Sequence, residues 1–104
     1  MTETVERVRV EILVDQPLLR RVEQVAAGAG ITGYTLLPLL GGRGASGPWR
    51  DDQLSGAQAK ILFLTITSRT RADRLTDALA DLLDSHGLLL AISRVEVIRG
   101  AKFT

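Results

Sequence analysis

Hydrophobic and polar residues alternate near the start of the chain with a period of two, which is typical of a β-strand. Val8, Val10, Ile12 and Val14 occupy every second position, so we expect a strand over residues 7–14. The apolar spacing then becomes helical, with one face formed by Leu18, Leu19, Val22, Val25, Ala26 and Ala29. We expect Asp15 to cap this helix and Gly28 and Gly30 to end it.

The same order of elements is predicted again further along the chain. Residues 32–40 and 59–67 are apolar, strand-like runs separated by a glycine-rich loop. A second helix is expected from an N-cap at Thr70, with Asp73 in the capping-box position, to His86 and Gly87. Residues 88–98 predict a fourth strand, bent near residues 91–93, and residues 99–104 a C-terminal tail.

Two β-α-β units joined by a long loop predict a single α+β domain over residues 1–104 with a ferredoxin-like fold. This fold has a four-stranded antiparallel sheet with both helices on one face. The third strand is apolar on both sides, because Leu62, Leu64 and Ile66 lie opposite Ile61 and Phe63. The helices can cover only one side, so we expect a homo-oligomer to cover the other.

Composition excludes several classes of function. The 104 residues carry a net charge of +1, which gives no concentrated positive charge for nucleic acid or a membrane surface. The chain has no cysteine, which excludes disulfides, a thiolate nucleophile and cysteine-ligated zinc. The polar N-terminal residues show no signal-peptide pattern, and no apolar run approaches the roughly 20 residues that span a bilayer. We therefore expect a cytoplasmic protein without direct membrane insertion.

The glycine-rich loop, residues 41–57, is the strongest candidate for a functional segment. Connections longer than about 12 residues in compact domains are commonly functional or disordered. Arginine among glycines offers a cation beside exposed backbone amides, a combination that binds phosphate or another small anion. The loop lacks the P-loop and dinucleotide-binding motifs, so a flexible loop without a specialised role stays an equal alternative.

Trp49, the only tryptophan, lies in this loop among glycine, proline and aspartate. An exposed tryptophan suits insertion into a partner. The alternative is that it folds back onto its own domain. Arg94, Arg99 and Lys102 gather near the C-terminus and either help to close an anionic pocket or serve only solubility.

No catalytic machinery can be assigned. His86 lacks a carboxylate or thiol partner and is best explained as a favourable charge at a helix C-terminus. Aspartates recur at helical spacing opposite the leucines, which is typical of a solvated face, at Asp73, Asp77, Asp81 and Asp84. Strand aromatics of the kind that stack RNA bases are missing from residues 7–14, and the third strand has only Phe63. Neither an enzyme nor a nucleic-acid-binding protein is indicated.

As a set, these features resemble a PII-like signalling protein. The resembling segments are residues 33–35 (Gly-Tyr-Thr), the loop that begins Gly-Gly-Arg-Gly at Gly41 in the position of the family's T-loop, and the ending over residues 95–103. Two departures separate the chain from the nitrogen-regulatory members. Residues 84–89 lack the phosphate-binding lysine of their B-loop, and no tyrosine lies between Gly41 and Gly56 to be uridylylated.

The shorter form is similar to the carboxysome-associated PII proteins and the regulators of bicarbonate transporters. That resemblance implies a homotrimer that binds ADP or AMP, and in some members bicarbonate, in clefts between subunits. Carried over by position, the nucleotide-binding residues would be Gly33, Tyr34, Thr35, Gly42, Arg43, Gly87, Leu88, Arg94 and Arg99. Bicarbonate would meet Gly41, Gly42 and Arg43, and a protein partner would meet Trp49 and Arg50.

The resemblance implies a non-enzymatic sensor without a metal or resident cofactor. Its ligand would order the T-loop-like segment and so control a partner in inorganic-carbon metabolism, such as a bicarbonate transporter or a carboxysome component. The alternative is a trimeric metal-tolerance protein of the CutA-like kind, or a structural oligomer of the same fold. Metal tolerance is disfavoured because soft divalent ions prefer thiolate and imidazole ligands.

Overall fold

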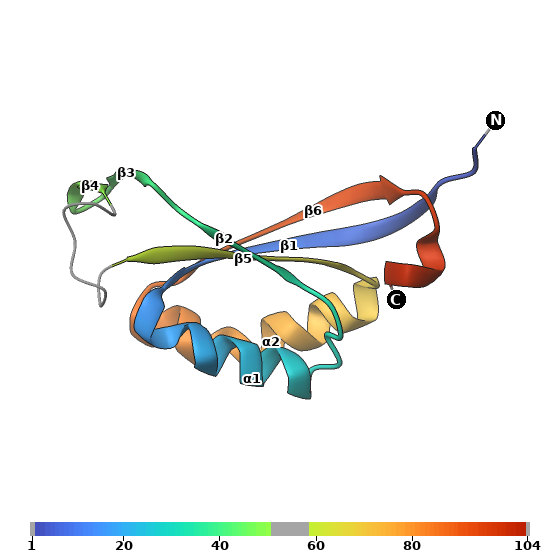
Figure 1. Ribbon diagram of the computed structural model, residues 1–104. Coiled ribbons are helices and arrows are strands. Elements are labelled where there is room, and N and C mark those ends of the chain that lie inside the picture. Colours follow the sequence, from blue (N-terminus) through green and yellow to red (C-terminus); the bar gives the residue numbers. More distant parts are fainter. Residues whose placement is uncertain (1, 51–58, 104) are drawn as a thin grey trace.

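The computed structural model describes residues 2–50 and 59–103 and has the predicted ferredoxin-like α+β architecture. One antiparallel sheet has the strand order β2-β5-β1-β6, formed by Thr35–Pro38, Lys60–Thr67, Val5–Asp15 and Leu89–Val97. The helices α1 (Leu19–Gly28) and α2 (Arg69–His86) both cover the same face of this sheet, while its other face is left open (Figure 1).

The hydrophobic core lies between the helices and the covered face. Val8, Val10, Ile12 and Val14 of β1 are at most 4% exposed, which confirms the period-two prediction. Phe63 of β5 lies directly opposite Ile12 and is fully buried. The helices complete the core with their predicted apolar faces, through Leu19, Val22, Ala26, Ala72, Leu75, Leu79 and Leu82. The four aspartates of α2 lie outside this core, as expected for a solvated face.

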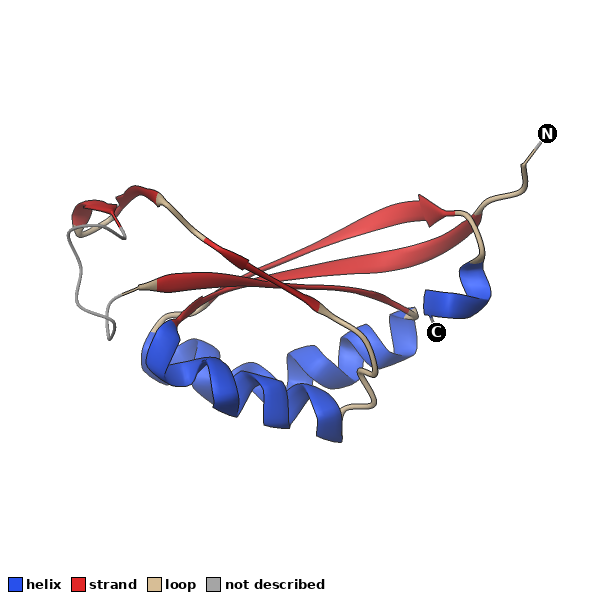
Figure 2. Cartoon of the chain, viewed as in Figure 1, coloured by secondary structure: helices blue, strands red, loops and turns tan. Residues whose placement is uncertain are grey.

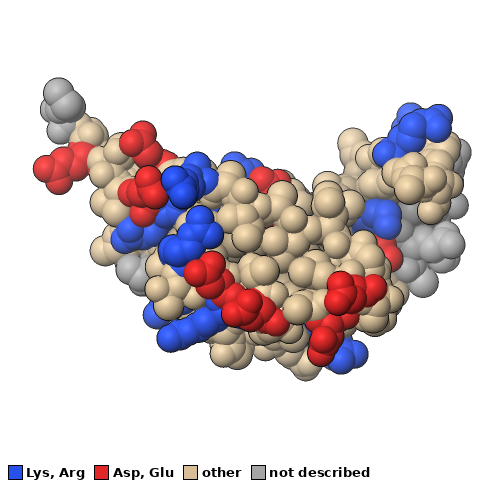
Figure 3. Space-filling view, turned by 180° about the vertical axis from the view of Figure 1, so that it is seen from behind, with Lys and Arg blue, Asp and Glu red and all other residues tan. Residues whose placement is uncertain are grey.

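The open face carries a row of four leucines that crosses the whole sheet. Leu37 of β2 pairs with Leu62 of β5, Leu62 pairs with Leu13 of β1, and Leu13 pairs with Leu89 of β6. Directly paired residues of antiparallel strands share one face, so these side chains form a continuous stripe. Leu37 and Leu89 are 39% and 63% exposed. Figure 3 shows charged side chains along the helical layer and at the N-terminal end of the molecule. The open face also carries charge, since Arg9 and Glu11 alternate with the buried residues of β1 and form an ion pair at 3.1 Å.

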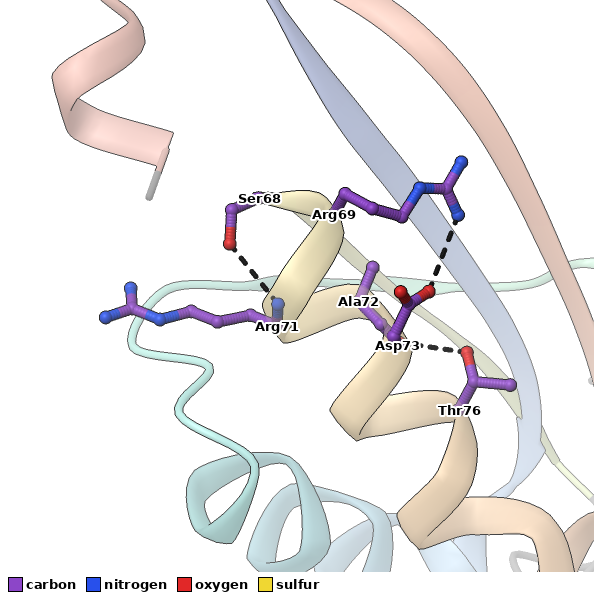
Figure 4. A network of polar contacts seen from close by, with 6 residues as sticks. All are labelled: Ser68, Arg69, Arg71, Ala72, Asp73 and Thr76. Carbon is purple, nitrogen blue, oxygen red and sulfur yellow. Dashed lines mark hydrogen bonds and ion pairs between the residues drawn. The ribbon is translucent and has the colours of Figure 1, made fainter.

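The predicted caps at the starts of both helices are wrong. Asp15 makes no cap hydrogen bond, and a 3₁₀ turn, η1 (Gln16–Leu18), precedes α1. The Asp15 carboxylate instead lies 2.6 Å from Nζ of Lys60 on β5. For α2 the N-cap is Ser68 rather than Thr70: its hydroxyl accepts a 3.3 Å bond from the Arg71 amide (Figure 4). Asp73 pairs with Arg69 one turn earlier, at 3.6 Å. The predicted end of α2 is confirmed, since Gly87 has the left-handed backbone typical of a helix C-cap.

Two strand predictions also need correction. β2 is shorter than residues 32–40: its ladder with β5 covers residues 35–38, followed by one further bond from the Leu39 amide to the Lys60 carbonyl at 3.2 Å. β6 pairs with β1 without interruption through residues 91–93, so the predicted bend is absent from the register.

The predicted loop, residues 41–57, and the predicted tail, residues 99–104, both contain regular structure in the part of the chain that is described. Residues 41–50 form a hairpin of β3 (Gly41–Gly44) and β4 (Gly47–Arg50), which extends beyond one end of the sheet (Figure 2). The rest of the predicted loop, residues 51–57, lies outside the described residues. The predicted tail contains a 3₁₀ turn, η4 (Gly100–Phe103), which lies at the same end of the molecule as the start of α2 (Figure 1).

Candidate functional site

A cavity of about 270 Å³ lies at the β2–β5 edge of the sheet and joins three distant parts of the chain. Its walls are residues 31–35, residues 64–67 of β5, and Lys102 and Phe103 of η4. Of the described residues that line it, Lys102 is the only charged one, and four threonines supply hydroxyl groups: Thr32, Thr35, Thr65 and Thr67. The cavity therefore combines apolar walls with hydroxyls and one cation, which suits a mainly apolar ligand with an anionic group.

The first wall is held in place by hydrogen bonds on both sides. The Ile31 amide donates a 3.0 Å bond to the Ala26 carbonyl, which turns the chain back at the end of α1. The Thr65 hydroxyl then donates a 2.7 Å bond to the carbonyl of Gly33. Because Thr65 is buried, this bond both satisfies its hydroxyl and fixes the backbone of residues 33–35 against β5.

Tyr34 is fixed on the helical side of that wall. Its ring stacks on Phe63, with centroids 4.6 Å apart and ring planes 22° from parallel. Its hydroxyl donates a hydrogen bond to the Glu23 carboxylate of α1. This hydrogen bond, then desolvation and the Glu23 charge, raise the pKa of Tyr34 above its usual value of 10.0. The phenol is thus a neutral structural group at physiological pH, although 41% of the residue is exposed.

The hairpin forms a second, separate group of predicted site residues. Gly42 pairs with Trp49, Arg43 with Pro48, and Gly41 with Arg50. In this register Trp49 lies on one face of the ribbon, while Arg43 and Arg50 lie on the other. The exposed arginines therefore form a basic face that does not include the tryptophan.

Trp49 lies in β4, directly opposite Gly42. A Cβ added at Gly42 would lie 3.1 Å from Cζ2 of Trp49, so the ring lies directly on the glycine. The Lys60 ammonium lies 5.5 Å from the ring centroid, within the range of a cation–π contact. Of the two interpretations of Trp49, the structure favours the one in which the side chain folds back onto its own domain.

The remaining predicted residues lie apart from the cavity. Gly87 is the C-cap of α2, and Leu88, which follows it, is partly buried against the core. Arg94 is exposed on β6 opposite Val8. Arg99 is exposed in the turn before η4 and has a positive φ of 62°. Within one chain, the structure therefore brings together only Gly33, Tyr34 and Thr35 of the predicted nucleotide-binding residues.

The predicted site residues omitted two parts of the cavity, residues 64–67 and the pair Lys102 and Phe103. The C-terminal cluster of cations was a usable indication for Lys102. The same cluster indicated Arg94 and Arg99 equally. Only the fold shows that, of these three residues, Lys102 lines the cavity. In the described parts of the chain, no three histidine or acidic side chains gather as metal ligands. None of the described helices is long and apolar enough to cross a membrane.

Comparison with known proteins identifies the class. The family model for nitrogen regulatory protein P-II matches residues 7–102, so the chain belongs to the P-II family. No curated protein sequence matches the chain.

Similar solved structures agree in fold. CPII, a PII-like protein from Thiomonas intermedia K12 in complex with ADP, AMP and bicarbonate, has a TM-score of 0.89 at 18% identity over 99% of this chain and 98% of CPII. A PII-like signalling protein from Thermus thermophilus has a TM-score of 0.81 at 24% identity, over 98% and 99% of the two chains. GlnK of B. subtilis, in complex with ATP, is more distant, with a TM-score of 0.61 at 13% identity over 86% and 82%.

Proposed function

We propose that this chain is a non-enzymatic PII-like signalling protein that binds ADP or AMP at the β2–β5 cavity. The observation that carries the proposal is the cavity itself, where residues 33–35 face a single cation, Lys102. Its apolar walls suit a purine and its threonine hydroxyls suit a ribose. One cation matches a mono- or diphosphate better than a triphosphate. The complex of CPII with ADP, AMP and bicarbonate supports the same ligand class.

The cleft is completed by a neighbouring subunit of a homotrimer. The leucine row on the open face supports this assembly, because four leucines across a sheet form an apolar stripe that a second copy can bury. In the trimer, Gly87 and Leu88 of the neighbour contribute backbone amides, and Arg94 or Arg99 contributes a second cation. None of these residues lines the cavity of its own chain.

The hairpin transmits the signal to a protein of inorganic-carbon metabolism. Its basic face, formed by Arg43 and Arg50, meets bicarbonate or phosphate at the backbone of Gly41 and Gly42. Glycines leave the peptide groups open to a small anion. Ligand binding then selects one arrangement of the hairpin, and that arrangement fits or rejects the partner.

Isothermal titration with AMP, ADP and ATP, each with and without bicarbonate, tests the proposal. We expect saturable binding of ADP near one site per chain. Lys102→Gln should weaken ADP by about tenfold, because a charge-assisted bond to phosphate is lost. Lys60→Gln is the matched control: it removes the other described lysine, which contacts Trp49 and Asp15 away from the cavity, and should leave ADP affinity unchanged. Failure of every nucleotide to bind the wild-type protein would refute the proposal.

A further inference from the structure

The guanidinium of Arg7, near the start of β1, holds the last turn of the chain. Its Nε donates a 3.1 Å bond to the Phe103 carbonyl, and its Nη2 donates a 3.0 Å bond to the Gly100 carbonyl. Its Nη1 donates a 2.8 Å bond to the carbonyl of Glu6. Within the described parts of the chain Arg7 forms no ion pair, so its donors serve backbone carbonyls rather than a carboxylate.

These bonds suit arginine in particular. The two bonds to η4 leave different nitrogens of one planar group and reach carbonyls three residues apart. A lysine ammonium would keep the charge but is a single point that cannot reproduce the fork. Phe103 is the last residue of η4, where carbonyls lack intrahelical partners, so its bond from Arg7 satisfies a group that would otherwise need water.

A second contact, between Gly100 and Val5, also fixes the turn. Gly100 is buried, and a Cβ added there would lie 2.8 Å from Cβ of Val5, also on β1. The chain reaches this position through the positive φ of Arg99, whose carbonyl accepts a 3.0 Å bond from the Lys102 amide. The start of β1 therefore determines where the turn lies, through the hydrogen bonds of Arg7 and the contact of Val5 with Gly100.

The position of η4 affects the cavity, because η4 carries two of the residues that line it. Lys102 and Phe103 close the cavity opposite residues 33–35. We infer that Arg7 is a positioning residue of the nucleotide site: by fixing η4 it presents the Lys102 ammonium to the ligand phosphates. This inference rests on the proposed function, but the hold of Arg7 on the turn is testable without any ligand.

The test compares Arg7→Lys with Arg9→Lys. Arg9 lies two positions further along the same strand and face, and it pairs with Glu11 at 3.1 Å rather than with η4. We expect Arg7→Lys to weaken ADP by about five- to tenfold, and Arg9→Lys to leave ADP affinity unchanged. Adenosine, which has no phosphate, should lose less affinity than ADP in Arg7→Lys, because it does not use the Lys102 ammonium.

A double-mutant cycle shows whether Arg7 acts through Lys102. In the Lys102→Gln background, Arg7→Lys should have almost no further effect on ADP affinity, because the group that it positions is gone. An equal loss in both backgrounds would mean that Arg7 acts by another route and would overturn the inference. Gly100→Ala, whose Cβ must displace Val5, should reproduce the effect of Arg7→Lys through an independent contact.

Limited trypsin digestion without nucleotide measures the hold on the turn directly. Cleavage after Lys102 removes the two C-terminal residues and is followed by mass spectrometry of the intact chain. We expect faster cleavage in Arg7→Lys than in Arg9→Lys or the wild type. Unchanged cleavage would overturn the inference whatever the binding results. If the wild type bound no nucleotide, the proposed function would fail, and the role of Arg7 in the nucleotide site would fail with it. Faster cleavage in Arg7→Lys would still establish that Arg7 fixes η4.

Discussion

The indole of Trp49 lies on Gly42, its directly paired neighbour in the β3–β4 hairpin. This packing explains a glycine at position 42, because any side chain there would occupy the space of the ring. The ring also lies near the Lys60 ammonium, and Lys60 pairs with Asp15 at the end of β1. Trp49 thus connects the hairpin to the body of the sheet.

Gly42→Ala should displace the indole, because the new Cβ would lie 3.1 Å from Cζ2 of Trp49. Trp49 is the only tryptophan, so intrinsic fluorescence reports on the hairpin alone. We expect a red-shifted emission maximum and stronger quenching by acrylamide, with a loss of less than about 1 kcal/mol in the free energy of unfolding. Gly44→Ala is the control, since a Cβ at Gly44 has no neighbour within 4 Å. An unchanged spectrum in Gly42→Ala would contradict this packing.

Tyr34 should titrate above its ordinary pKa of 10.0, because its hydroxyl donates to Glu23. It is the only tyrosine, so tyrosinate absorbance near 295 nm follows this one residue. A pKa that is raised on folding means that the native state holds the proton more tightly. Its contribution to stability is present below pH 10.0 and is lost as the pH rises through the native pKa.

Glu23→Gln provides the comparison for Tyr34. It removes the carboxylate charge but keeps an acceptor oxygen of similar size, so the pKa of Tyr34 should fall back toward 10.0. Equal midpoints in the wild type and Glu23→Gln would show that the Glu23 charge does not raise the pKa of Tyr34 in solution.

The core and the order of elements could be predicted because each depends on local spacing. The period-two run of β1 and the leucines of α2 mark their buried faces without reference to any distant residue. The cavity could not be predicted in this way. Its last wall depends on Arg7 and Phe103, which are 96 positions apart and carry no shared pattern. The hairpin was missed because Gly-rich strands have no hydrophobic alternation to indicate pairing.

The two wrong helix caps have separate causes. Asp15 and Thr70 are residue types that cap helices well, but capping is decided by where the backbone first turns. Asp15 has a cation opposite it in the neighbouring strand, and its carboxylate pairs with Lys60 instead. Ser68 stands one residue before the first turn of α2, so its hydroxyl is the one that reaches the free amide of Arg71.

Ser68→Ala should therefore destabilise the protein by about 1 kcal/mol, the usual effect of removing an N-cap side chain. Thr70→Ala is the matched control, because Thr70 is exposed within the first turn of α2 and is not the cap. Urea denaturation followed by far-UV circular dichroism measures both variants. A larger loss in Thr70→Ala than in Ser68→Ala would restore the cap that the sequence alone suggested.

Leu62→Glu should separate the proposed trimer without unfolding the chain. Leu62 lies inside the leucine row, paired with Leu13 on one side and Leu37 on the other. A carboxylate there would be harmless on a surface in water, but burial against a second copy would leave it unpaired in an apolar contact. We expect light scattering after gel filtration to give a mass of about one chain for Leu62→Glu and three chains for the wild type.

Ala80→Glu is the control for that experiment, because Ala80 lies on the exposed side of α2 in the layer opposite the open face. It introduces the same carboxylate in place of an apolar side chain and should leave the wild-type mass unchanged. The two substitutions thus separate a specific effect at the leucine row from a general effect of added charge. If Leu62→Glu kept the wild-type mass with a native circular dichroism spectrum, the leucine row would not be the subunit contact, and the nucleotide cleft would need a different second wall.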